Sequence, residues 1–210
     1  MALQTYIEAD IPRIGYGQMA RIALCDTFAQ AAQARADGFH GAIVYNDLTR
    51  AYEQALSHVA QIHAEAPEEA LRQMAKARAA FTAKVMEELA CTKVEVSTEE
   101  VRGQSIRPYP HTDLLVSLYF LIIASENATI LYPALPNHID RGKSRFDSLP
   151  TADGGRKYII NMDYDGEGLT SEYVPPRGSA VVLFPYNGRS LPHREPLIEK
   201  PRALSTLHFS

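Results

Sequence analysis

Three side chains in the second half of the chain have the types and the spacing of metal ligands. His111 and Asp113 stand two residues apart in PYPHTDLL, at the head of a predicted strand. Side chains two positions apart on a strand point to the same face, so both could hold one ion. His193 follows the apolar run GSAVVLF, within SLPHREP. Two imidazoles and one carboxylate form a facial triad, which suits Fe(II) and leaves three coordination positions open.

Each of these pieces is weak when taken alone. A His-x-Asp triplet occurs in many proteins, and a single histidine on a strand is more often packed or hydrogen-bonded than bound to a metal. The alternative is that His111, Asp113, His193 and the later Arg202 are unrelated surface or capping groups. Their order along the chain, with each residue beside an apolar strand, favours one common site.

In this order the residues make the chain resemble the Fe(II)/2-oxoglutarate-dependent oxygenases, over about residues 38 to 210. The similarity is carried by DGFHGAIVYNDL, RPYPHTD, ATILYP, the turn PRG before SAVVLFP, SLPHREP and PRALSTLHF. The resemblance implies a double-stranded β-helix in which His111, Asp113 and His193 hold iron. It also implies that Arg202 pairs with the distal carboxylate of the co-substrate 2-oxoglutarate. Arginine suits that role because its planar fork makes two charge-assisted hydrogen bonds to a carboxylate.

The reaction that the resemblance implies uses dioxygen and oxidises an unactivated C–H bond, with hydroxylation as the default outcome. Desaturation, ring closure and epoxidation use the same kind of site and stay open. Related halogenases carry a small residue at the position of Asp113, so the carboxylate here favours oxygenation.

The chain departs from the family pattern next to Arg202. Many members have Arg-x-Ser, in which the serine adds a hydrogen bond to the same carboxylate, but Leu204 stands two positions after Arg202. Ser205 is expected on the opposite face of the strand. Another group must then assist Arg202, and Tyr119 is the first candidate because a regular strand would place it on the face of Asp113. Tyr132 is the second candidate, and ordinary aromatic packing is the alternative for both tyrosines.

The residues that would bind the substrate are less well defined. Arg107 and Tyr109 share the face of His111 if their strand is continuous, and Arg189 and Arg194 lie near the third ligand in the sequence. These side chains could bind an anionic group, or the arginines could simply be solvated. A polar segment over residues 136–156 is predicted to be a long loop that could close over a small molecule, such as an amino acid or a natural-product intermediate.

The elements that must position these groups change in character near residue 95. Before it the sequence predicts helices over 19–36, from Asn46 to before Pro67, and from Pro67 onward, with a strand over 41–45. After it the chain has short β-branched and aromatic runs that predict strands over 93–97, 104–109, 114–123, 129–132, 157–164, 179–184 and 202–209. We therefore expect one α+β domain over residues 1–210, with a mainly helical support (1–92) packed on one sheet of a jelly-roll or cupin-like core (93–210).

Length and composition agree with a single globular domain. The chain has 210 residues, of which 46% are hydrophobic and 22% charged. Its formal net charge of -4 argues against a nucleic-acid partner. Its apolar runs are too short to cross a membrane, and its start does not resemble a secretory signal, so the cytoplasm is the expected location. Cys25 and Cys91 are expected to be inert packed thiols, and a homodimer formed through the helices stays open.

Three functions compete at this point. The first is an iron- and 2-oxoglutarate-dependent hydroxylase of a small molecule. The second is a cupin-like module that binds a metal or a small ligand without redox turnover, and the third is a metal-dependent isomerase or lyase on the same core. A buried Arg202 aimed at the metal pocket would favour the first over the second. The third would need a separate general base, for which the sequence offers no obvious residue.

Overall fold

The computed structural model describes residues 6–10, 20–103, 112–113, 115–126, 128–133, 172–197 and 200–210 with their side chains, and the backbone of 145–150 and 156–161. These residues form a mixed α+β fold, so the predicted fold class is confirmed at this level. In chain order the elements are β1 (Ile7–Glu8), β2 (Ile22–Cys25), α1 (Phe28–Ala36), β3 (Gly41–Val44), α2 (Asp47–Ile62), α3 (Pro67–Leu89), β4 (Val94–Arg102), β5 (Tyr119–Ala124), β6 (Ile130–Leu131), β7 (Arg145–Pro150), β8 (Arg156–Asn161), β9 (Ala180–Leu183), β10 (His193–Arg194) and β11 (Arg202–Phe209).

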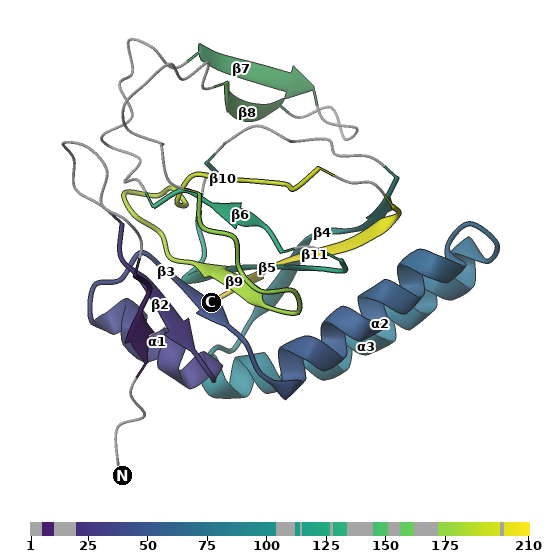
Figure 1. Cartoon of the computed structure of the whole chain (residues 1–210), viewed down its shortest axis with the longest axis horizontal. Helices are drawn as coiled ribbons and strands as arrows, with labels where there is room; N and C mark the ends of the chain where they lie inside the picture. The colour runs from purple at the N-terminus through teal and green to yellow at the C-terminus, as the bar shows by residue number, and fades with distance from the viewer. Residues whose placement is uncertain are drawn as a thin grey trace.

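A seven-stranded sheet forms the centre of the molecule. Its strand order is β1-β2-β3-β9-β5-β11-β4, and β2 with β3 is its one parallel pair. The helices cover one face of this main sheet, and the two-stranded β6–β10 sheet lies over the other face (Figure 1). We call the face toward β6 and β10 the inner face. The β7–β8 hairpin lies beyond β6–β10, farthest from the helices (Figure 1).

Local sequence signals explain the second and third helices, and both predictions are confirmed. Asn46 caps α2 through a capping box, in which its side chain accepts from the backbone N–H of Thr49 and the Thr49 hydroxyl accepts from the Asn46 N–H. Pro67 occupies the first turn of α3, where its missing N–H is no loss. The helix ends at Ala90, which adopts the left-handed conformation with φ 53°.

The predicted helix over 19–36 is wrong in its first half. Residues Ile22–Cys25 form β2, which pairs in parallel with β3, and α1 begins only after Thr27. The Thr27 side chain and Gln30 form a capping box that starts the helix there. Alanine and leucine have high helix propensity, but propensity differences are below about 1 kcal/mol per residue, so pairing with a neighbouring strand overrides them.

The strands in the middle of the main sheet bury apolar side chains on both faces. Along β5, Tyr119 and Leu121 pack with the helices, whereas Phe120 and Ile122 pack on the inner face. β11 pairs with β5, and its side chains alternate between the two faces in the same way. Only every second residue of β11 therefore faces β6 and β10.

Two further predictions change with the structure. The segment 136–156 is not one continuous loop, because Arg145–Pro150 form β7 and pair with β8. The sequence TADGG between the two strands is typical of a hairpin turn. The predicted strand over 114–123 is shorter in the structure and begins at Tyr119. The predicted strand over 104–109 lies outside the described residues.

Within the described residues, no helix has both the length and the apolar character needed to span a membrane.

Candidate metal centre

Two of the three predicted metal ligands are described, and the fold brings them together. Asp113 lies before β5, and His193 opens β10, yet Asp113 Oδ2 is 3.2 Å from His193 Nε2. His193 is 3% exposed, and the Asp113 side chain is partly exposed. The third predicted ligand, His111, lies outside the described residues.

The backbone holds the His193 ring in one orientation. Its Nδ1 is 2.9 Å from the carbonyl oxygen of Leu191. A carbonyl only accepts hydrogen bonds, so Nδ1 carries the proton and donates it. In the neutral ring, Nε2 then has its lone pair toward Asp113. Metal-binding histidines are commonly oriented by such a bond at the other ring nitrogen.

Asp113 is held against the segment that leads to His193. The Asp113 N–H donates to the Ser190 hydroxyl at 2.8 Å across 77 residues of sequence. The Ser190 N–H donates in return to the Asp113 carbonyl at 2.9 Å. Leu115 continues the contact by donating to the Gly188 carbonyl at 2.9 Å. We call these two hydrogen bonds between Asp113 and Ser190 the Ser190 clip. Ser190 is fully buried, so the clip is shielded from water.

The pair fits a divalent cation by donor type and by spacing. Nitrogen and oxygen ligands lie about 2.1 Å from a first-row metal ion, so two that meet at a right angle are about 3.0 Å apart. The observed separation of 3.2 Å is close to that value. A neutral imidazole lone pair facing a carboxylate is repelled unless a cation lies between them, so the contact needs either a metal ion or a protonated His193. No group of three His, Cys, Asp or Glu side chains comes together within the described part of the chain.

Arg202 opens β11 and is buried with 2% exposure. Its partner in the register is Arg102, the last residue of β4. On β11 the side chain of Arg202 shares the inner face with Leu204, which packs in the inner core. Burial, together with the charge of Arg102, lowers the pKa of Arg202 to about 10, so the guanidinium remains charged at neutral pH.

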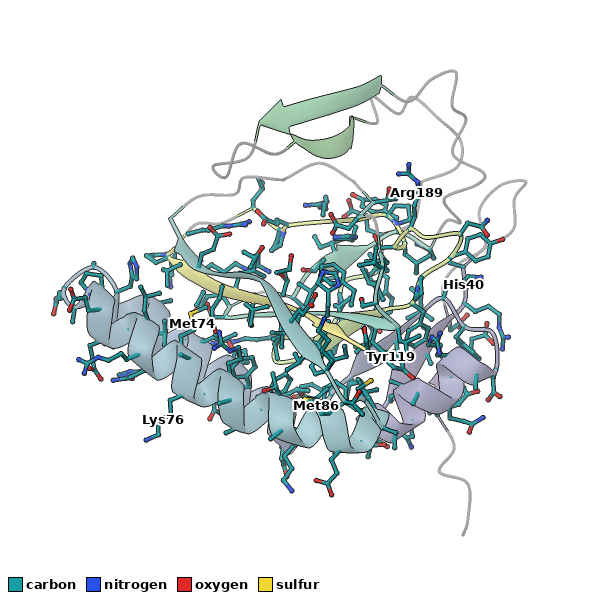
Figure 2. All side chains as sticks on the ribbon, turned by 180° about the vertical axis from the view of Figure 1, so that it is seen from behind. His40, Met74, Lys76, Met86, Tyr119 and Arg189 are labelled. Carbon is teal, nitrogen blue, oxygen red and sulfur yellow. The ribbon has the colours of Figure 1, made fainter. Side chains whose placement is uncertain are left out.

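The structure corrects the prediction that Tyr119 assists Arg202. Tyr119 lies at the opposite end of the β5–β11 pairing, where its partner is Phe209. Its ring packs on the helix side, edge-on to Phe184 at 5.9 Å and under the Arg35 guanidinium at 5.3 Å. Figure 2 shows its label beside the helices. The prediction assumed strand alternation from Asp113 onward, but regular strand starts only at Tyr119 itself.

Tyr132 is likewise engaged elsewhere. Its hydroxyl donates to Glu172 Oε1 at 2.5 Å and accepts from Arg194 Nε at 2.8 Å. Leu131 is the register partner of His193, so the neighbouring Tyr132 and Arg194 point to the other face of the small sheet. The proposed role of Tyr132 at the 2-oxoglutarate carboxylate is therefore corrected as well.

Of the predicted substrate residues, the structure describes Arg194, which pairs with Glu172 and Tyr132, and Arg189. Arg189 Nη1 donates to the Thr112 hydroxyl at 3.3 Å, directly beside Asp113. Figure 2 shows Arg189 on the side of the molecule away from the helices. Arg107 and Tyr109 lie outside the described residues.

Several residues that the sequence reasoning passed over lie in this region. Ser190 provides the clip described above. Glu195 follows His193 by two positions and forms a buried ion pair with Arg102. Glu195 lies just past the end of β10, so strand alternation does not predict its position.

His208, on β11, has a defined setting on the inner face. It stacks on Phe120 at 4.6 Å, and its Nδ1 lies 2.8 Å from the Ser117 hydroxyl. That hydroxyl donates to the Tyr119 carbonyl, so His208 Nδ1 is the donor to it. Burial lowers the pKa of His208, and the charges of Asp113 and Glu95 oppose this shift.

A comparison of the sequence with protein-family models and with curated proteins finds no match.

Proposed function

We propose that this protein is an Fe(II)- and 2-oxoglutarate-dependent dioxygenase that hydroxylates an unactivated C–H bond of a small molecule. The observation that carries the proposal is the 3.2 Å contact between Asp113 Oδ2 and His193 Nε2, with Nδ1 of the same ring held by a backbone carbonyl. Two segments far apart in the sequence thereby present one carboxylate and one imidazole in the spacing of neighbouring metal ligands.

The course of the chain supports a double-stranded β-helix as the fold. After β5 the chain enters β6 in the small sheet, passes through the separate β7–β8 hairpin, returns to the main sheet as β9, crosses to the small sheet again as β10 and returns as β11. This alternation between two facing sheets is what such a fold requires. His193 opens a strand of the small sheet, and Arg202 opens the next strand of the main sheet.

In this proposal Asp113, His193 and His111 hold the iron, and Arg202 binds the distal carboxylate of 2-oxoglutarate. The chemistry that iron, 2-oxoglutarate and dioxygen supply together is oxidation of the substrate C–H bond to an alcohol, with 2-oxoglutarate converted to succinate and carbon dioxide. The Leu191 carbonyl keeps the proton of His193 on Nδ1, so Nε2 is available as a ligand. Ser190 holds the Asp113 backbone in place. Burial of Arg202 keeps water from competing for its guanidinium.

Succinate formation tests the proposal without knowledge of the substrate. Anaerobically purified protein would be given Fe(II), 2-oxoglutarate and air, and uncoupled turnover would be followed by succinate release. His193→Gln, Asp113→Asn and Arg202→Met are each expected to abolish it. His58→Gln, on the exposed side of α2, is the matched control and should leave it unchanged.

The negative results are equally defined. Absence of succinate in the unaltered protein, together with no iron- and 2-oxoglutarate-dependent absorbance without oxygen, would refute the oxygenase. It would favour a binding module that does not turn over.

A further inference from the structure

The inner face of the main sheet holds a second arginine directly beside Arg202. Arg102 and Arg202 are register partners on the neighbouring strands β4 and β11. The Arg202 residue is 2% exposed and the Arg102 side chain 10% exposed. Two guanidinium groups so close repel each other, which agrees with the lowered pKa of Arg202.

Arg102 has two carboxylate partners, and one of them comes from the opposite layer. Glu100, two residues earlier on β4, accepts from Arg102 Nε at 2.7 Å. Glu195, from the segment after β10, pairs with Arg102 Nη1, and its side chain is 9% exposed. A buried ion pair stabilises a fold little, because desolvation of both charges offsets their attraction. The ion pair therefore matters less for the stability of the fold than for the net charge near the Arg202 guanidinium.

The ion pair also connects the two parts of the candidate site. Glu195 lies two positions after His193, just past the end of β10, and an extended chain spans at most about 7 Å over two residues. Arg102 lies beside Arg202 on the main sheet. A carboxylate bound at Arg202 would therefore be attracted by the positive charge of Arg102 and repelled by the negative charge of Glu195. Both residues are buried, so water screens these interactions little.

We propose that the Arg102–Glu195 ion pair sets the affinity of the Arg202 site for a dicarboxylate: Arg102 is a second cation that attracts the bound carboxylate, and Glu195 positions Arg102 and neutralises part of its charge. This inference rests on the proposed function, because it takes 2-oxoglutarate as the ligand of Arg202. It gives these two residues a role that a purely structural ion pair would not have.

The proposal predicts that removing the charge of Arg102 and removing the charge of Glu195 change 2-oxoglutarate affinity in opposite directions. The dissociation constant of 2-oxoglutarate would be measured by calorimetry in the presence of Mn(II), which replaces Fe(II) without oxygen chemistry. Arg102→Gln is expected to raise the dissociation constant about tenfold, and Glu195→Gln to lower it about threefold. The double variant Arg102→Gln/Glu195→Gln changes no net charge and should bind within about threefold of the unaltered protein.

Glu99→Gln is the matched control, since Glu99 lies on the same strand but pairs with Arg78 of α3. It should leave the dissociation constant unchanged. Thermal unfolding of each variant reports whether it folds, and the double variant restores charge balance if a single variant does not fold.

The possible failures are distinguishable. If the unaltered protein binds no 2-oxoglutarate, both the proposed function and this inference are refuted. If it binds, but the two single variants weaken binding equally or leave it unchanged, the inference alone is refuted and the ion pair is structural.

Discussion

Replacing Ser190 by alanine should weaken both the fold and the proposed metal site, because its hydroxyl joins the segments that carry Asp113 and His193. The Ser190 hydroxyl accepts from the Asp113 N–H at 2.8 Å, and the serine is fully buried. Alanine leaves that N–H without its acceptor, which costs about 2 kcal/mol. For a chain of this size each kcal/mol lowers the melting temperature by about 2–4 °C, so a decrease of about 4–8 °C is expected.

The same substitution should loosen Asp113 relative to His193. Groups that orient metal ligands without binding the metal typically contribute about 10- to 100-fold to affinity. Because Ser190 holds the backbone of Asp113 rather than its carboxylate, the lower end of that range, about tenfold, is the expected loss of Mn(II) affinity in Ser190→Ala.

Thermal unfolding and Mn(II) titration would be measured side by side with Ser179→Ala. Ser179 is equally buried, but its hydroxyl has no hydrogen-bond partner among the described residues. Its replacement should therefore be close to neutral in both assays. Equal melting temperatures and equal Mn(II) affinities for the two variants would refute the reasoning about the clip.

Three other predictions concern the scaffold. Phe81→Ala removes a buried ring that stacks on Tyr52 at 4.3 Å and should cost about 3–5 kcal/mol in chemical denaturation; a loss below about 1 kcal/mol would mean that this core does not support the sheet. Asn46→Ala removes the cap of α2 and should cost about 1 kcal/mol by the same measurement; an unchanged stability would contradict the capping role. Burial and the charge of Arg21 lower the pKa of His40, so the unfolded chain takes up the proton first and stability should fall as the pH drops below about 6.5. His40→Asn keeps an acceptor for the Arg21 N–H but does not titrate, so it should lose less stability between pH 7 and 5; an identical pH dependence would contradict this account.

Some features follow from the sequence alone because they depend on neighbours in the chain. The cap at Asn46 and the start of α3 at Pro67 are local signals, and the structure confirms both. The residue types of Asp113 and His193 predict metal binding without any knowledge of their contact, and this stays a prediction.

Other features are decided only by pairing between distant segments. Residues 22–25 read as helix, but pairing with β3 makes them a strand. The face of Tyr119 depends on where regular strand begins, because alternation cannot be carried through the irregular residues before it. The 3.2 Å contact between Asp113 and His193 joins two segments far apart in the sequence, and the Arg102–Glu195 pair joins β4 to the segment after β10. Local sequence sets residue types and helix ends, whereas strand register and sheet packing decide which side chains meet.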